Sequence, residues 1–202
     1  ADVVAGNYRT VDEAGKLCRE YKNYSLQEIK PEGNLYGQPW GKVIRATVFE
    51  NLCFPEGFWY EDSIFEYCIY PFWKKKYTIE NDVYAYRYNL NGITYKSRGN
   101  VKSIDHYWIM LYLWDWIKDK QILRSDEWLQ ISMLDNMVLG YSRTKDLDEK
   151  TVQSGFVVLR KRYLSSFANP PRQQNKYILL DKSIRKKDFG QFKLLCDRWR
   201  YL

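Results

Sequence analysis

Three segments between residues 37 and 94 decide the fold of this 202-residue chain: GQPWGKVIRATVF (37–49), LCFPEGFWYEDSIFEY (52–67) and VYAYRYNLNGIT (83–94). The first segment has apolar residues at helical spacing and predicts a short amphipathic helix over residues 40–51. In the second, a turn at Pro55 and Gly57 precedes a helix that begins near Asp62, with Ser63 and Glu66 at capping-box spacing. Aromatic alternation over residues 77–89 predicts a strand.

In the rest of the chain, the pattern of apolar and polar residues changes near residue 100. A β-branched run over residues 2–8 predicts a strand followed by a hairpin-like turn at Gly15. Beyond residue 100 the pattern is helical, in four predicted segments: 104–123, 125–141, 152–167 and 176–199. We therefore expect a mixed α/β protein, with a few strands in residues 1–100 and a mainly helical region in residues 101–202.

Composition excludes several classes of protein. Hydrophobic residues make up 45% and charged residues 28% of the chain, which is typical of a globular protein rather than a disordered one. The four cysteines form no CxxC pair, so neither a zinc site nor a disulfide framework is indicated, and free thiols in a reducing compartment are expected. The most apolar stretch, residues 107–117, is too short to span a bilayer. No signal-peptide pattern opens the sequence, and the expected location is cytoplasmic.

The ordered motifs of the first half resemble the bacterial family 2 glycosyltransferases of the GT-A fold. In that family a W-x-K-x-x-R segment, here Trp40 to Arg45, precedes F-P-E-G-x-x-Y-E-D-x-x-F, here Phe54 to Phe65. A strand ending in Y-x-Y-R, here Tyr84 to Arg87, follows with a Gly-Ile pair. The resemblance covers roughly the first 100 residues, and it is the order of the motifs that makes it specific.

The resemblance implies transfer of a sugar from a nucleotide-sugar donor to an acceptor hydroxyl, with inversion at the anomeric carbon, in cell-surface polysaccharide synthesis. By the family pattern, Asp62 is the base that takes the acceptor proton, and Glu61 orients Asp62 or the acceptor. The first turn of a helix keeps such a carboxylate ionised and ready to accept a proton. The alternative is that Glu61 and Asp62 only cap the helix and complement its dipole.

Three further residues are candidates for substrate binding. In the resembling enzymes the first segment lies beside the donor and acceptor pocket, so Trp40 is expected to stack on a sugar and Lys42 to steady a phosphate charge. The alternative places Trp40 in the core and Lys42 in solvent. The planar guanidinium of Arg87 can form two parallel hydrogen bonds to a diphosphate. The alternative is an ion pair of Arg87 with Glu80 or Asp82. A ligand role for His106 is not expected, because no Cys or carboxylate cluster surrounds it.

The sequence also departs from the family. A complete enzyme of this type carries an upstream nucleotide-binding region and a D-x-D motif that holds a divalent metal, Mg²⁺ or Mn²⁺, on the donor diphosphate. Asp146-Leu147-Asp148 matches this motif but lies between two predicted helices, and we expect it to be a solvated loop. We therefore expect the C-terminal part of a glycosyltransferase, with no metal site of its own and no activity in isolation.

Basic clusters in the second half support rival interpretations. The chain carries a formal charge of +7, and its Lys and Arg runs are interleaved with aromatic residues such as Tyr163 and Trp199. This combination suits a nucleic-acid-binding or protein-binding module without catalysis, although the clusters are interrupted by acidic residues. Basic helices also suit the anionic inner face of a membrane, where lipid-linked or glycan acceptors are found in the resembling family. The simplest alternative is a solvated helix face.

Overall fold

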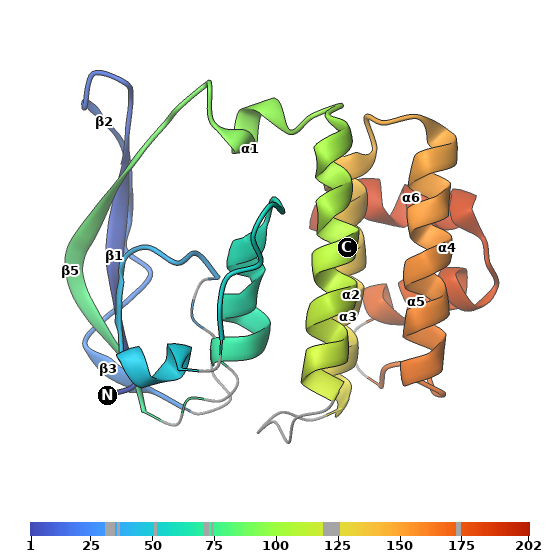
Figure 1. Ribbon diagram of the computed structural model, residues 1–202, viewed down its shortest axis with the longest axis horizontal. Helices are drawn as coiled ribbons and strands as arrows, with labels where there is room; N and C mark the ends of the chain where they lie inside the picture. The colour runs from blue at the N-terminus through green and yellow to red at the C-terminus, as the bar shows by residue number, and fades with distance from the viewer. Residues whose placement is uncertain are drawn as a thin grey trace. The chain divides into compact units, whose positions relative to one another are not determined.

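The computed structural model describes residues 1–30, 35, 37–50, 52–70, 73, 75–118, 126–172 and 175–202. Its backbone contacts divide the chain into two compact units: Ala1–Lys96 with Asp115–Leu123, and Ser97–Trp114 with Arg124–Leu202. The expected mixed α/β class is confirmed. Figure 1 shows the strands in the first unit and the long helices in the second.

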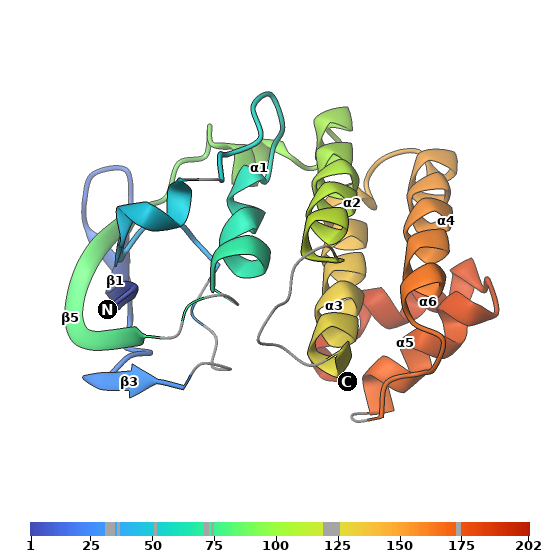
Figure 2. The same cartoon turned by 60° about the horizontal axis from the view of Figure 1, so that its bottom comes forward.

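The sheet of the first unit is built on its first strand, β1 (Val3–Val11). One edge of β1 pairs antiparallel with β2 (Leu17–Tyr21) through its last residues and with β4 (Lys42–Ile44) through its first residues. The other edge pairs in parallel with β5 (Lys76–Arg87), whose far side holds β3 (Gln27–Ile29). The order β2-β1-β5-β3 is therefore mixed, and Figure 2 shows how strongly β5 curls.

Two buried residues of β1, Gly6 and Asn7, lie where the pairing of β1 with β5 is irregular. The register shifts on both sides of Asn7, whose side chain is buried. Its Nδ2 donates to the carbonyls of Tyr24 (2.9 Å) and Glu80 (2.8 Å), and its Oδ1 accepts from the Tyr24 N–H, which ties the following loop to the sheet. A Cβ on Gly6 would lie 2.6 Å from both methyl carbons of Val83, so only glycine fits there.

Helices form the second unit and begin after a 3₁₀ turn at Val101–Ile104. Within it α3 packs against α4, α5 and α6. Both views show α4 and α5 side by side (Figures 1 and 2). A short α1 (Ile93–Lys96) belongs to the first unit. The long helices are α2 (Asp105–Lys118), α3 (Asp126–Thr144), α4 (Glu149–Ser166), α5 (Asn175–Arg185) and α6 (Phe189–Asp197).

His106 lies buried between α2 and α3. The guanidinium of Arg143 can only donate, so at 2.6 Å the Nδ1 atom of His106 is the acceptor. The Nε2–H group then donates to the carbonyl of Asn136 at 3.0 Å. Burial, followed by the charge of Arg143, lowers the pKa of His106 to about 3. The only histidine of the chain is thus a neutral packing residue.

Two predicted helices are wrong in detail. Residues 40–51 form no amphipathic helix: β4 occupies Lys42–Ile44 and a 3₁₀ turn follows at Ala46–Phe49. The predicted helix over residues 176–199 is two helices, because Lys187 has a left-handed φ of 58° and Asp188 begins α6 by accepting a hydrogen bond from the Gln191 N–H. Edge pairing with β1 explains the first difference, and local capping explains the second.

Candidate functional site

The Glu61-Asp62 pair follows an unusual backbone conformation. Tyr60 has a φ of 67° and lies in the left-handed region, which costs a non-glycine residue about 1–2 kcal/mol. Glu61–Ser63 then form a 3₁₀ turn (η2), and Phe65–Ile69 form a π-helical turn (η3). Strained backbone and π turns are both concentrated at functional sites in proteins.

The predicted helix start is therefore correct in position but not in type. The residue before η2 is Tyr60, whose side chain makes no capping hydrogen bond, and the same holds for Ile64 before η3. The capping box expected from Ser63 and Glu66 is not the device that begins this segment. Its backbone is held instead by hydrogen bonds such as the one from the Ser63 N–H to the Tyr60 carbonyl at 3.1 Å.

Asp62 lies close to a buried phenol. Tyr70 is only 2% exposed, and its pKa is raised first by burial and then by the neighbouring Tyr24, Glu66 and Asp62. Its hydroxyl donates to the Gln38 carbonyl at 3.4 Å. Tyr70 thus connects the helical segment that carries Asp62 with the loop that precedes β4.

Lys42 approaches the same phenol from β4. Its Nζ atom lies 5.6 Å from the centre of the Tyr70 ring and donates to the carbonyls of Gln38 (2.6 Å) and Trp40 (3.4 Å). Burial lowers the pKa of Lys42 to about 8. The solvated lysine of the alternative reading is therefore not what the structure shows. We call Lys42, Tyr70 and Asp62 the phenol cluster, because Lys42 lies near the Tyr70 ring and Asp62 acts on the phenol through its charge.

Lys42 is expected to titrate near pH 8, whereas lysines in an unfolded chain titrate near pH ~10.4. The unfolded chain then binds more protons between these two values, so the contribution of Lys42 to stability rises with pH across this window. NMR of ¹³Cε-labelled lysine measures the titration, with Lys22 as the internal control because its ion pair with Asp82 raises its pKa. A Lys42 signal that moves only above pH 10 would contradict this expectation.

Trp40 belongs to a row of aromatic rings on the sheet. Its ring stacks on Tyr84 at 4.6 Å and meets the edge of Tyr8 at 4.9 Å. Tyr8 in turn stacks on Tyr21 at 4.5 Å. None of the rings is buried, so Trp40 is a packed residue with part of its surface in solvent. We call this set the ring row; its members are Tyr8, Tyr21, Trp40, Tyr84, Tyr86 and Tyr88.

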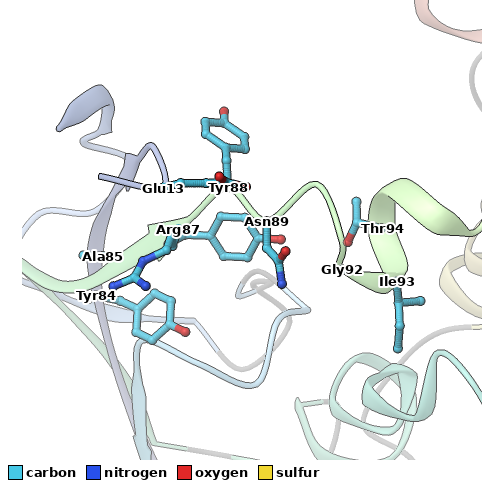
Figure 3. A pocket seen from close by; sticks show the side chains of 10 residues that line it. Glu13, Tyr84, Ala85, Arg87, Tyr88, Asn89, Gly92, Ile93 and Thr94 are labelled. Atoms are coloured by element: carbon cyan, nitrogen blue, oxygen red, sulfur yellow. The ribbon is translucent and has the colours of Figure 1, made fainter. Parts of the chain in front are cut away.

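Arg87 ends β5 and lines an open hollow of about 760 Å³. Figure 3 shows the strand end on one side of this hollow, α1 on the other and Asn89 between them. Among the described residues Arg87 forms no ion pair with Glu80 or Asp82, and Asp82 pairs instead with Lys22 at 2.7 Å. We call this feature the β5 hollow; the residues that line it are Glu13, Tyr84–Asn89 and Gly92–Thr94.

The five predicted site residues therefore fall in two places of the first unit. Lys42 and Asp62 lie around the Tyr70 phenol, with Glu61 next in the chain. Arg87 lies in the β5 hollow, which shares Tyr84 and Tyr86 with the ring row around Trp40. The sequence did not indicate a role for Tyr70 or the left-handed backbone of Tyr60. The only signal was the Y-E-D motif, which begins at Tyr60.

The downstream D-x-D motif lies in the loop before α4, with both aspartates exposed, and its second aspartate also caps that helix. Asp148 begins α4, and its Oδ1 accepts from the Thr151 N–H at 2.9 Å, which lowers the pKa of the Asp148 carboxyl. Over the described part of the chain, no three His, Cys, Asp or Glu side chains are grouped so that they could hold a metal ion.

Comparison with known proteins returned no similar protein-family model, curated protein or solved structure. Within the residues that the structure describes, no helix has the length and apolar character needed to cross a membrane.

Proposed function

We propose that this chain carries the acceptor side of an inverting glycosyltransferase that resembles family 2 and acts in cell-surface polysaccharide synthesis. The observation that supports this best is the phenol cluster. There the half-buried Lys42 lies near the Tyr70 ring, and Asp62, placed two residues after the strained Tyr60, acts on the same phenol through its charge. A packing role alone needs neither a left-handed tyrosine nor a lysine drawn out of solvent.

In the proposed reaction, the acceptor hydroxyl gives its proton to the Asp62 carboxylate as its oxygen attacks the anomeric carbon of the donor. The bond between that carbon and the diphosphate oxygen breaks, and the nucleoside diphosphate leaves with the electron pair. Lys42, whose pKa of about 8 leaves it mostly protonated at neutral pH, balances the negative charge of the diphosphate.

The described residues do not form a binding site for the divalent metal that the resemblance implies. Asp148 of the Asp146-Leu147-Asp148 motif caps α4, and in the described ranges no three His, Cys, Asp or Glu side chains form a group that could hold a metal ion. No step of the proposed reaction is routed through a metal held by this chain. Donor and metal binding are proposed for a partner region that acts together with the phenol cluster.

The test compares the complete product of the gene with the 202-residue chain. We expect the complete product to release a nucleoside diphosphate from one member of a nucleotide-sugar panel, with Mg²⁺ or Mn²⁺ present, in the presence of a membrane and glycan extract. Calorimetry of the 202-residue chain with the same panel is expected to show no tight binding. Micromolar binding of a donor to the chain alone would contradict the proposal that a partner region binds the donor.

Two further results would contradict the proposal itself. One is a complete product that transfers no sugar from any donor of the panel. The other is saturable binding of single-stranded nucleic acid at physiological salt by the 202-residue chain, which would favour a binding module. The release assay detects nucleoside diphosphate directly, so it works before the acceptor has been identified.

A further inference from the structure

The ring row crosses three neighbouring strands in register. Tyr8 of β1 is paired with Tyr21 of β2 on one side and with Tyr84 of β5 on the other. Trp40 lies against both Tyr8 and Tyr84, and its ring centre is 5.5 Å from that of Tyr86. The rings therefore form one continuous cluster rather than separate contacts.

The β5 hollow continues this surface and adds polar groups. Tyr86 and Tyr88 meet edge to face at 6.3 Å at the end of the strand. The guanidinium of Arg87 and the carboxylate of Glu13 make no hydrogen bond or ion pair with the described residues. Asn89 uses its Oδ1 to accept from the Asn91 N–H, which leaves its Nδ2 donors to the hollow. The volume of about 760 Å³ is in the range of small-ligand sites.

We infer that the ring row and the β5 hollow together bind a saccharide chain of more than one sugar, which serves as the acceptor. A sugar presents C–H groups on its faces, which suit aromatic rings, and hydroxyls on its rim, which suit planar donors and acceptors. A guanidinium, a carboxylate and an amide beside the rings of Tyr86 and Tyr88, which meet each other edge to face, match both requirements. This inference rests on the proposed function, because it names the acceptor of that reaction.

Charge favours a saccharide over a nucleic acid on this surface, although bases also stack on aromatic rings. Residues 1–96 contain twelve Lys and Arg against thirteen Asp and Glu, a net charge of −1. Residues 115–123, which belong to the same unit, add two Asp and two Lys and so no net charge, and the positive excess of the chain therefore lies outside the unit that carries the ring row. Binding along the many phosphates of a nucleic-acid backbone would require the opposite distribution.

The experiment applies the 202-residue chain to an array of mono- to hexasaccharides built from glucose, galactose, N-acetylglucosamine and rhamnose. We expect binding to a subset of the oligosaccharides, weaker or absent for the monosaccharides. Tyr88→Ala should weaken this binding by about two- to tenfold, and Arg87→Ala by at least about tenfold. Arg87→Lys should resemble Arg87→Ala, because the planar fork is lost.

Tyr201→Ala is the matched control, since Tyr201 is 89% exposed and lies outside the first unit. It should bind as the unchanged chain does, and melting temperatures confirm that each variant is folded. An array with no bound oligosaccharide, or binding that survives both Tyr88→Ala and Arg87→Ala, would overturn the inference. Sugar transfer by the complete product to a lipid acceptor, with no glycan bound, would overturn it and leave the proposed function standing.

Discussion

Replacing Asp62 with asparagine should slow sugar transfer by the complete gene product about 10²–10⁴-fold while the protein stays folded. The amide has nearly the shape of the carboxylate but cannot take the acceptor proton. The loss corresponds to roughly 3–5 kcal/mol of transition-state stabilisation at ~1.36 kcal/mol per decade. Removal of a base lowers kcat, whereas donor binding should remain as it was.

The capping interpretation of Asp62 makes the opposite forecast. Asparagine caps helices about as well as aspartate, so a residue that only caps would leave turnover nearly unchanged. Asp146→Asn is the matched control: this exposed aspartate lies in the loop before α4 and should have no effect on kcat. Steady-state kinetics and a melting curve for both variants separate these interpretations, and normal turnover in Asp62→Asn would remove Asp62 from the mechanism.

Gly155→Ala is expected to destabilise the second unit by about 1–3 kcal/mol. A Cβ at this position of α4 would overlap the Cε2 atom of Tyr107 and lie 2.6 Å from its Cζ atom. The ring cannot move away easily, because the Tyr107 hydroxyl lies 2.6 Å from the Oγ1 atom of Thr144, which itself donates to the Gly140 carbonyl. The midpoint of urea unfolding measures the effect.

Gly190→Ala provides a control of opposite sign. Gly190 lies in the first turn of α6, where a Cβ would meet only the Oδ1 atom of Asp188 at an ordinary 3.6 Å. Alanine there removes the entropic cost of glycine in a helix, so stability should rise by about 0.5–1 kcal/mol. Equal effects of the two substitutions would show that the contact of α4 with Tyr107 is looser than described.

Local patterns in the sequence were sufficient for the mixed class, the first and last strands and the approximate positions of α2, α3 and α4, whereas α5 and α6 were predicted as one helix. These features depend on periodicities of two and 3.6, which neighbouring residues carry on their own. The turn at Gly15 is of the same kind, because its φ of 85° suits glycine and is met between paired strands. Roles for Asp62, Glu61, Trp40, Lys42 and Arg87 remain predictions that rest on the order of motifs.

Tertiary structure alone decided what surrounds those residues. Residues 42–44 became a strand because the edge of β1 was open to pairing, which no helical pattern within residues 40–51 reveals. The pKa of Lys42 falls to about 8 because folding buries it, and the ring centre of Tyr70, distant in the chain, lies 5.6 Å from its Nζ atom. Likewise the ring row exists only because β1, β2 and β5 lie in register. Pairing and burial depend on contacts between distant residues, and their energies are absent from any single segment of sequence.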